Sequence, residues 1–215
     1  MTNEVVFLDS MESFTVKKIQ CWGSDELIAL VAGISYGNLE VVAIETLLRK
    51  LIAREHLSPF EHAGFTFYLE IPIFVARQLL RYRHISANEM SRRYTTNKKS
   101  EFEFYFPNEL KTFNDSYYED RYSSAQLTIL SAVTEYKDAL MRGVKPELAR
   151  TLLPVSLMTN LYLSTNIREL MHILKQRLAP AAQKEIQYVA QKMESVFRNE
   201  FPLTYRHYKG ENSSD

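Results

Sequence analysis

Residues 63–94, AGFTFYLEIPIFVARQLLRYRHISANEMSRRY, hold the transition that decides the fold. Residues 63–71 are rich in aromatic and β-branched side chains, which is typical of a strand. Pro72 ends that strand and suits the first turn of a helix, so the pattern predicts a helix from Pro72 to about His84. A strand that runs directly into a helix indicates a fold that mixes both elements.

Hydrophobic periodicity outside this stretch predicts mostly helices. We expect strands over residues 4–9 and 14–22, and helices over residues 24–34, 39–56, 120–142, 146–153, 166–177 and 181–199. The predicted class is therefore α+β, helix-rich, with a small, mainly antiparallel sheet. We expect a single domain over residues 1–207 and a disordered tail over residues 208–215.

Composition restricts the class of protein. The chain has 215 residues, of which 46% are hydrophobic, and its 26 basic residues equal its 26 acidic ones. A net charge of zero argues against a broad basic face for nucleic acid. A single cysteine, Cys21, excludes an intrachain disulfide, and the sequence has no apolar stretch of membrane-spanning length. We predict a cytoplasmic protein that binds neither nucleic acid nor membrane.

Five arginines lie between Arg77 and Arg93, and Glu89 is the only acid among them. Neighbouring guanidinium groups repel each other unless an anion, usually a phosphate, binds between them. On the predicted helix, Gln78 and Arg81 are three residues apart and share a face with Arg77. The cluster predicts an oxyanion-binding active site.

Other arginines are candidates for the same site. The six glycines are scattered, so neither a dinucleotide fingerprint nor a P-loop can form, and side chains must hold any phosphate. Arg150, Arg168 and Arg177 lie on predicted helices with apolar neighbours. The alternative is that each is a solvated or salt-bridged surface residue.

The arginine run resembles the signature of a known family. Arg81, Tyr82 and Arg83, seven further residues and then Ser91 are similar to the Arg-His-Arg, seven residues, Ser motif of flavin-dependent thymidylate synthases. The blocks at residues 58–81, 86–94, 147–150 and 166–177 resemble that family in order and spacing. The resemblance covers about residues 24–205. It implies methylation of dUMP to dTMP, with methylenetetrahydrofolate as carbon donor, FAD as cofactor and NADPH as reductant.

The resemblance also implies roles for individual residues. The residues that match dUMP-binding positions are Gln78, Arg81, Glu89, Ser91, Arg93, Arg150 and Arg177. Arg177 is the catalytic candidate, because a guanidinium beside the uracil ring stabilises negative charge on it. The residues that match FAD-binding positions are His56, Ser58, Glu61, Arg81, Tyr82, Arg83, Asn88, Glu89, Asn166, Arg168 and His172. The implied assembly is a homotetramer whose subunits share these sites.

Some assignments stay open at this point. Tyr82 replaces the histidine of the motif, so its contact with flavin is undetermined, as is the tautomer of His172. Ser91 is either a hydrogen-bond donor, which we favour, or a nucleophile. Arg77 and Arg92 receive no role.

The sequence offers two other kinds of reactive site, a cysteine nucleophile and a metal site. Cys21 lies in an apparent strand without a neighbouring base, and is interpreted as an inert packed thiol rather than the nucleophile of flavin-free synthases. His56, Glu61 and His62 lack the spacing of a zinc helix, so no metal is expected and His62 is interpreted as a buried, hydrogen-bonded histidine.

The alternative function is non-catalytic. In that interpretation, the same arginines bind a nucleotide or single-stranded RNA, with Tyr82 and Tyr94 stacking on bases.

Overall fold

The computed structural model describes residues 5–37, 43–94, 102–111 and 123–210, and the chain divides into two compact units. The first unit comprises Met1–Thr15, Glu70–Arg77 and Glu89–Leu161. The second unit comprises Val16–Leu69, Gln78–Asn88 and Tyr162–Asp215. The expected single domain over residues 1–207 stays a prediction.

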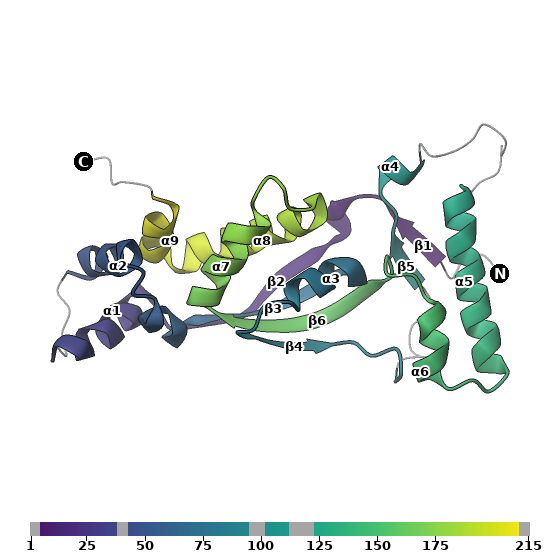
Figure 1. Ribbon diagram of the computed structural model, residues 1–215, viewed down its shortest axis with the longest axis horizontal. Coiled ribbons are helices and arrows are strands. Elements are labelled where there is room, and N and C mark those ends of the chain that lie inside the picture. Colours follow the sequence, from purple (N-terminus) through teal and green to yellow (C-terminus); the bar gives the residue numbers. More distant parts are fainter. Residues whose placement is uncertain (1–4, 38–42, 95–101, 112–122, 211–215) are drawn as a thin grey trace. The chain divides into compact units, whose positions relative to one another are not determined.

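A four-stranded sheet has the order β2-β3-β6-β4 (Figure 1), formed by β2 (Thr15–Trp22), β3 (Gly64–Pro72), β6 (Met158–Asn166) and β4 (Ile85–Glu89). The Ile73 amide donates to the Leu157 carbonyl at 3.0 Å. At the other end of the same two strands, the Ile167 amide donates to the Ala63 carbonyl at 2.9 Å. Since the start of each strand meets the end of the other, β3 and β6 are antiparallel. This confirms the predicted antiparallel sheet in a helix-rich α+β protein.

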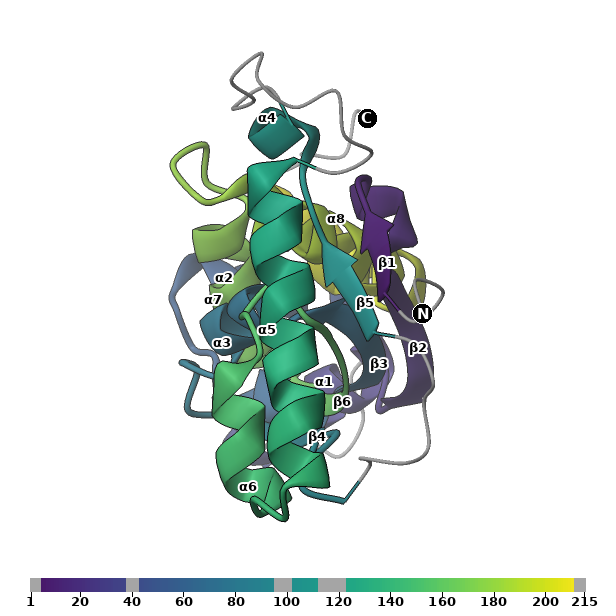
Figure 2. The same cartoon turned by 90° about the vertical axis from the view of Figure 1, so that its right-hand side faces the viewer.

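The first unit has its own core around a two-stranded sheet. Strands β1 (Val5–Leu8) and β5 (Phe102–Tyr105) are parallel, and α5 (Ser124–Met141) runs beside them (Figure 2). Ser123 and Gln126 form a capping box that fixes the start of α5. The short helices α4 (Asn108–Lys111), α6 (Pro146–Ala149) and η4 (Arg150–Leu152) complete the unit, with η1 (Met11–Ser13) near its N-terminal strand. Its buried core contains Phe102, Phe104, Phe106, Ile129, Val133, Tyr136, Ala149 and Leu157.

Outside its strand segments, the second unit is mainly helical. Its helices are α1 (Asp25–Gly33), η2 (Ile34–Tyr36), α2 (Ile44–Ala53), η3 (Ser58–His62), α7 (Ile167–Arg177), α8 (Lys184–Glu200) and α9 (Pro202–Lys209). The buried Asp25 carboxylate accepts hydrogen bonds from the amides of Leu203 (2.9 Å) and Thr204 (3.1 Å), so the start of α1 caps the start of α9. Phe65 of β3 packs edge-on against Phe201 at the end of α8, with ring centroids 5.4 Å apart.

The arginine-rich helix is shorter than the sequence predicts. Helix α3 (Ile73–Leu79) follows β3 directly, as expected, but ends five residues before His84. Arg81 therefore lies in the turn after the helix and shares no helical face with Gln78, which corrects that prediction. Residues 85–89 form β4 instead, because they find a pairing partner in β6.

The other predicted elements are present, with different ends. The elements that the sequence analysis did not predict also include β5, β6, α4 and α9. Helix α9 continues through Lys209, which is two residues into the segment expected to be a disordered tail. Residues 4, 39–42, 120–122 and 211–215 of the predicted segments lie outside the described residues. Among the helices that the structure describes, none is long and apolar enough to cross a membrane.

Candidate active site

Helix α7 carries predicted site residues at both ends and in its middle. Asn166 is its N-cap, and the side-chain oxygen accepts a hydrogen bond from the Glu169 amide at 2.8 Å. Arg168 follows in the first turn, His172 lies in the middle and Arg177 is the last helical residue. Because Asn166 uses its oxygen as the cap, its amide nitrogen is the group that remains for a ligand.

One pocket of the second unit, of about 290 Å³, is lined by Arg81, Tyr82, His172, Gln176 and Arg177. The Arg177 guanidinium lies over the Tyr82 ring, with Cζ 5.2 Å from the ring centroid. Its Nη2 donates to the main-chain carbonyl of Gln78 at 3.0 Å. The pocket therefore contains a guanidinium that is held in place by a carbonyl and an aromatic face.

The tyrosine of the arginine motif is part of this pocket's wall. Tyr82 is 8% exposed, and its hydroxyl donates to Oε1 of Gln176 at 3.0 Å. Burial raises the pKa of the Tyr82 hydroxyl, and the nearby Arg177 cation opposes the shift. The hydroxyl is therefore protonated at neutral pH. Since Tyr82 is buried while Tyr94 is 73% exposed, only Tyr94 of the two predicted stacking residues presents an exposed ring.

A second pocket of the same unit, of about 410 Å³, gathers other predicted residues. Its lining consists of Trp22, Glu61, Arg83, His84, Ile85, Ser86, Ser164, Thr165 and Asn166. Arg168 forms an ion pair with Glu61. A Cβ atom at Gly64 would overlap the Trp22 ring and the Thr165 carbonyl, so the glycine lets the indole pack against the strands here. The lining combines the Arg83 cation, the Glu61 carboxylate and the His84 imidazole with hydroxyls, an amide and the Trp22 indole.

The first unit holds the remaining predicted nucleotide residues. Glu89 accepts a hydrogen bond from the Thr159 hydroxyl at 2.8 Å. Arg93 lies 3.9 Å from the Glu147 carboxylate, and its amide donates to the Ser91 hydroxyl at 3.3 Å. Arg150 is exposed at the start of η4, in the segment that also contains Glu147. Cations from two distant parts of the sequence are thus presented on this unit.

Some predicted residues are not brought into either pocket. His56, Ser58 and Asn88 lie outside the linings of the two pockets, and all three are exposed. Gln78 donates its side-chain amide to Gln183 at 2.8 Å and meets Arg177 only through its main chain. Their proposed roles rest on the family resemblance.

Several lining residues were not predicted. Gln176 directly precedes Arg177 on the predicted helix, and this position was the signal that could have identified it as a site residue. Trp22 is the chain's single tryptophan, at the end of a predicted strand, and nothing in its local sequence indicates a pocket. Ser164 and Thr165 lie on β6, the strand that the sequence analysis did not predict.

The unassigned arginines differ from each other. Arg77 is exposed on α3. Arg92 packs its guanidinium over the Phe102 ring at 5.1 Å, and burial lowers its pKa. Arg92 therefore contributes to the core of the first unit.

Cys21 and His62 differ in how well they agree with the sequence analysis. Cys21 lies in β2 and is half-buried, and burial followed by the Glu200 charge raises its pKa. A raised pKa disfavours the thiolate and agrees with an inert thiol. His62 is exposed, so its interpretation as a buried histidine is wrong. Within the described ranges, no group of three or more His, Cys, Asp or Glu residues could hold a metal ion.

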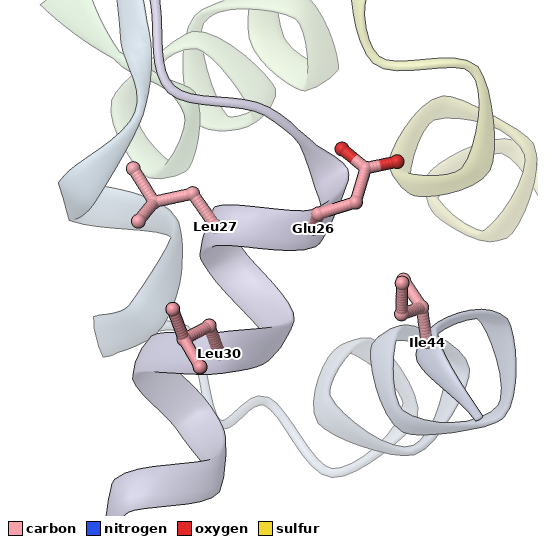
Figure 3. Close-up of a pocket in the computed structure, with 4 residues that line it drawn as sticks. All are labelled: Glu26, Leu27, Leu30 and Ile44. Carbon is pink, nitrogen blue, oxygen red and sulfur yellow. The ribbon is translucent and has the colours of Figure 1, made fainter. Parts of the chain in front are cut away.

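A third pocket lies between α1 and α2 of the second unit and contains no predicted site residue. It measures about 380 Å³ and is lined by Glu26, Leu27, Leu30 and Ile44. Figure 3 shows Leu27 and Leu30 projecting from the same side of α1, away from Ile44. The lining is apolar apart from one carboxylate and offers no cation for an anionic ligand.

Comparison with known proteins gives matches over most of the chain. The family model described as thymidylate synthase complementing protein matches residues 18–203. A flavin-dependent thymidylate synthase of Thermotoga neapolitana is 36% identical over 195 residues, which cover 88% of each chain. A Thermus thermophilus protein of the same name is 34% identical over 204 residues, covering 88% of this chain and 73% of the relative.

A solved structure is similar in fold and sequence. It is the UMP/dUMP methylase PolB from Streptomyces cacaoi bound with 5-Br dUMP. The TM-score is 0.79 and the sequence identity is 30%, with 96% of this chain and 97% of that chain covered.

Proposed function

The chain belongs to the family of flavin-dependent thymidylate synthases, and we propose that it converts dUMP to dTMP by reductive methylation. It is then a methyltransferase with methylenetetrahydrofolate as carbon donor, FAD as cofactor and NADPH as reductant. The similarity to a methylase bound with a brominated dUMP supports dUMP as the substrate.

The pocket around Arg177 carries this proposal. Its guanidinium keeps a full positive charge, because the carbonyl of Gln78 and the ring of Tyr82 hold it without neutralising it. Beside a uracil ring, such a cation stabilises negative charge on the ring amide. The negative charge on the ring amide in turn raises the electron density on the ring carbon that attacks the methylene group. Arg177 is therefore the residue that we assign to catalysis.

Other cations are assigned to the nucleotide phosphate. Arg93 and Arg150 are exposed on the first unit, and Ser91 adds a hydroxyl. Arg81 lines the Arg177 pocket of the second unit. Each charge-assisted hydrogen bond contributes about 1.5 to 3 kcal/mol, so three or four account for micromolar binding after association costs. Gln78 and Glu89 complete the set of nucleotide residues by family position.

The second pocket has a donor set that fits FAD. FAD carries two phosphates, hydroxyls and aromatic rings, and the lining supplies Arg83, hydroxyls, the Asn166 amide and the Trp22 indole. Arg168 lies beside this lining through its ion pair with Glu61. When bound, reduced FAD supplies the hydride that completes the methyl group. The remaining family positions for FAD are His56, Ser58, Arg81, Tyr82, Asn88, Glu89 and His172.

We assign the chain to a cytoplasmic homotetramer. A chain without a glycine-rich phosphate loop needs many side chains to hold FAD, and neighbouring subunits can supply them. The single cysteine, which excludes an intrachain disulfide, suits a reducing compartment.

The proposed function is tested with the purified protein reconstituted with FAD. We expect a flavin absorption spectrum, bleaching of that spectrum by NADPH, and formation of dTMP from dUMP and methylenetetrahydrofolate, measured by mass spectrometry. Omission of the folate should leave dUMP unchanged. A protein that stays colourless and forms no dTMP would instead support the non-catalytic nucleotide or RNA binder.

A further inference from the structure

Tyr82 contacts three residues of the Arg177 pocket with three different parts of its side chain. Its face lies under the Arg177 guanidinium at 5.2 Å, and its hydroxyl donates to Gln176 at 3.0 Å. Its ring is nearly perpendicular to the His172 ring, with centroids 5.7 Å apart. A residue with this many contacts inside one pocket determines how that pocket is shaped.

The Arg177 guanidinium depends on the ring for its orientation. The hydrogen bond from Nη2 to the Gln78 carbonyl does not by itself fix the plane of the guanidinium, which can still turn about that bond. Its Nε is buried, and within the described part of the chain no acceptor contacts it. An aromatic face beneath the guanidinium fixes the plane, because the cation is attracted to the ring's negative face.

The hydroxyl of Tyr82 begins a chain of hydrogen bonds. Gln176 accepts from Tyr82 through Oε1, and its Nε2 lies 3.2 Å from Nε2 of His172. The Gln176 amide nitrogen is therefore the donor to His172, which leaves the proton of the neutral imidazole on Nδ1. Burial raises the pKa of Tyr82 above its already high ordinary value, so its hydroxyl is protonated and donates to Gln176 at neutral pH. Gln176 precedes Arg177 directly, so an anchored Gln176 also restrains the end of α7.

We propose that Tyr82 is a positioning residue whose ring fixes the plane of the Arg177 guanidinium and whose hydroxyl fixes Gln176. This inference rests on the proposed function, because that function gives Arg177 its role beside the uracil. A histidine, which the family motif has at this position, is shorter and ends in no hydroxyl. The chain's departure from the motif is thus explained by a contact that tyrosine makes with Gln176.

The first test separates the ring from the hydroxyl in the FAD-loaded protein. Tyr82→Leu removes both, while Tyr82→Phe keeps the ring. We expect Tyr82→Leu to lower kcat about 10- to 100-fold, since small misplacements of a catalytic group have effects of this size. The KM for dUMP should change less than about 3-fold, and kcat is compared at saturating FAD so that a weaker hold on flavin does not enter the comparison. Tyr82→Phe should keep kcat within about 5-fold of wild type, because the phenylalanine ring still lies against the Arg177 guanidinium.

A double-mutant cycle tests whether Tyr82 acts through Arg177. An ammonium has no plane to orient, so in an Arg177→Lys background the loss caused by Tyr82→Leu should shrink to about 3-fold or less. Equal losses in both backgrounds would overturn the proposal, as would a Tyr82→Phe variant that is as impaired as Tyr82→Leu. Wild-type turnover is measured first, because absence of dTMP from the wild type contradicts the proposed function rather than the role of Tyr82.

A second cycle covers the case in which Tyr82→Leu does not fold. Gln176 is exposed, so Gln176→Leu should leave the fold intact. Tyr82→Phe and Gln176→Leu break the same hydrogen bond, and the double variant should therefore lose no more kcat than the worse single variant. If the kcat losses of the two single variants instead multiply in the double variant, the role of the hydroxyl is overturned.

Discussion

Arg168 and Arg177 lie on the same helix, α7, and their surroundings are opposite in kind. Arg168 lies in the first turn with its side chain 52% exposed, and it is paired with the Glu61 carboxylate. Arg177 ends the helix, half-buried, against a carbonyl and an aromatic ring. Exposed ion pairs contribute at most about 1 kcal/mol, so Arg168 can exchange Glu61 for another anion at little cost.

The helix dipole reinforces the difference. A cation is disfavoured at a helix N-terminus and favoured at a C-terminus, by about 0.3 to 1 kcal/mol near the surface. Arg168 therefore gains from a neighbouring anion, whereas Arg177 is stabilised without one. Arg168 is thus suited to exchange anionic partners, while Arg177 is a fixed charge for stabilising a reacting ring.

The largest effect is expected at the fixed arginine. Arg177→Ala should lower kcat for dTMP formation by about 100-fold or more, because it removes a preorganised charge from the ring. The oligomeric state by size-exclusion chromatography should not change. Lys175→Ala is the matched control, since Lys175 is exposed in the same last turn. Unchanged turnover of Arg177→Ala would contradict its catalytic assignment and remove the contrast with Arg168.

The fold around these arginines could be predicted only in part. The strand from residue 63 and the following helix have clear local signals, namely alternating aromatic residues and Pro72. The end of α3 has none, because its following residues are compatible with a helix and become β4 only through pairing with β6. Strand β6 did carry a sequence signal, because Leu161 and Leu163 alternate with their neighbours. In the structure both leucines are buried and Tyr162 between them is exposed.

Prediction of the site had a similar limit. Helical spacing and family position placed His172 and Arg177 on one helix, which the structure confirms. The contacts that fix Arg177 are long-range, because Gln78 is 99 residues away and Tyr82 is 94 residues from Gln176. Local sequence patterns contain no information about pairs at such separations, so the partners of Tyr82 could be found only from coordinates.

The exchangeable arginine should affect cofactor affinity. Arg168→Ala should weaken FAD binding about 10-fold, which is the loss of one charge-assisted hydrogen bond. Glu61→Gln should leave FAD affinity equal or tighter, because Arg168 then has no competing carboxylate. Both affinities are measured by fluorescence titration of FAD. Equal weakening in the two variants would show that the ion pair itself, and not exchange of its partner, is what FAD binding requires.

A smaller effect is expected at the aromatic wall of the second pocket. Trp22 is the chain's single tryptophan, so its emission reports on this pocket alone. We expect FAD to quench that emission, and Trp22→Phe to weaken FAD binding by about 5-fold or less, since stacking contributes about 0.5 to 1.5 kcal/mol beyond area. Free riboflavin at equal absorbance corrects for the inner-filter effect. Emission that is insensitive to bound FAD would place the cofactor away from Trp22.

The smallest effect concerns the helix that carries both arginines. The Tyr208 hydroxyl of α9 donates to the Met171 carbonyl of α7 at 3.2 Å, and burial raises its pKa to about 12. A tyrosine whose folded pKa exceeds its unfolded value of about 10 stabilises the fold below pH 10, and that contribution is lost as the pH rises toward 12. Tyr208→Phe should therefore cost about 1 kcal/mol of unfolding free energy at pH 7. The difference from wild type should disappear between pH 10 and 12, in urea unfolding curves measured across that range. A difference that stays constant with pH would show that the hydroxyl ionises equally in both states. In that case, α7 would be held by its packing against α8 rather than by this bond.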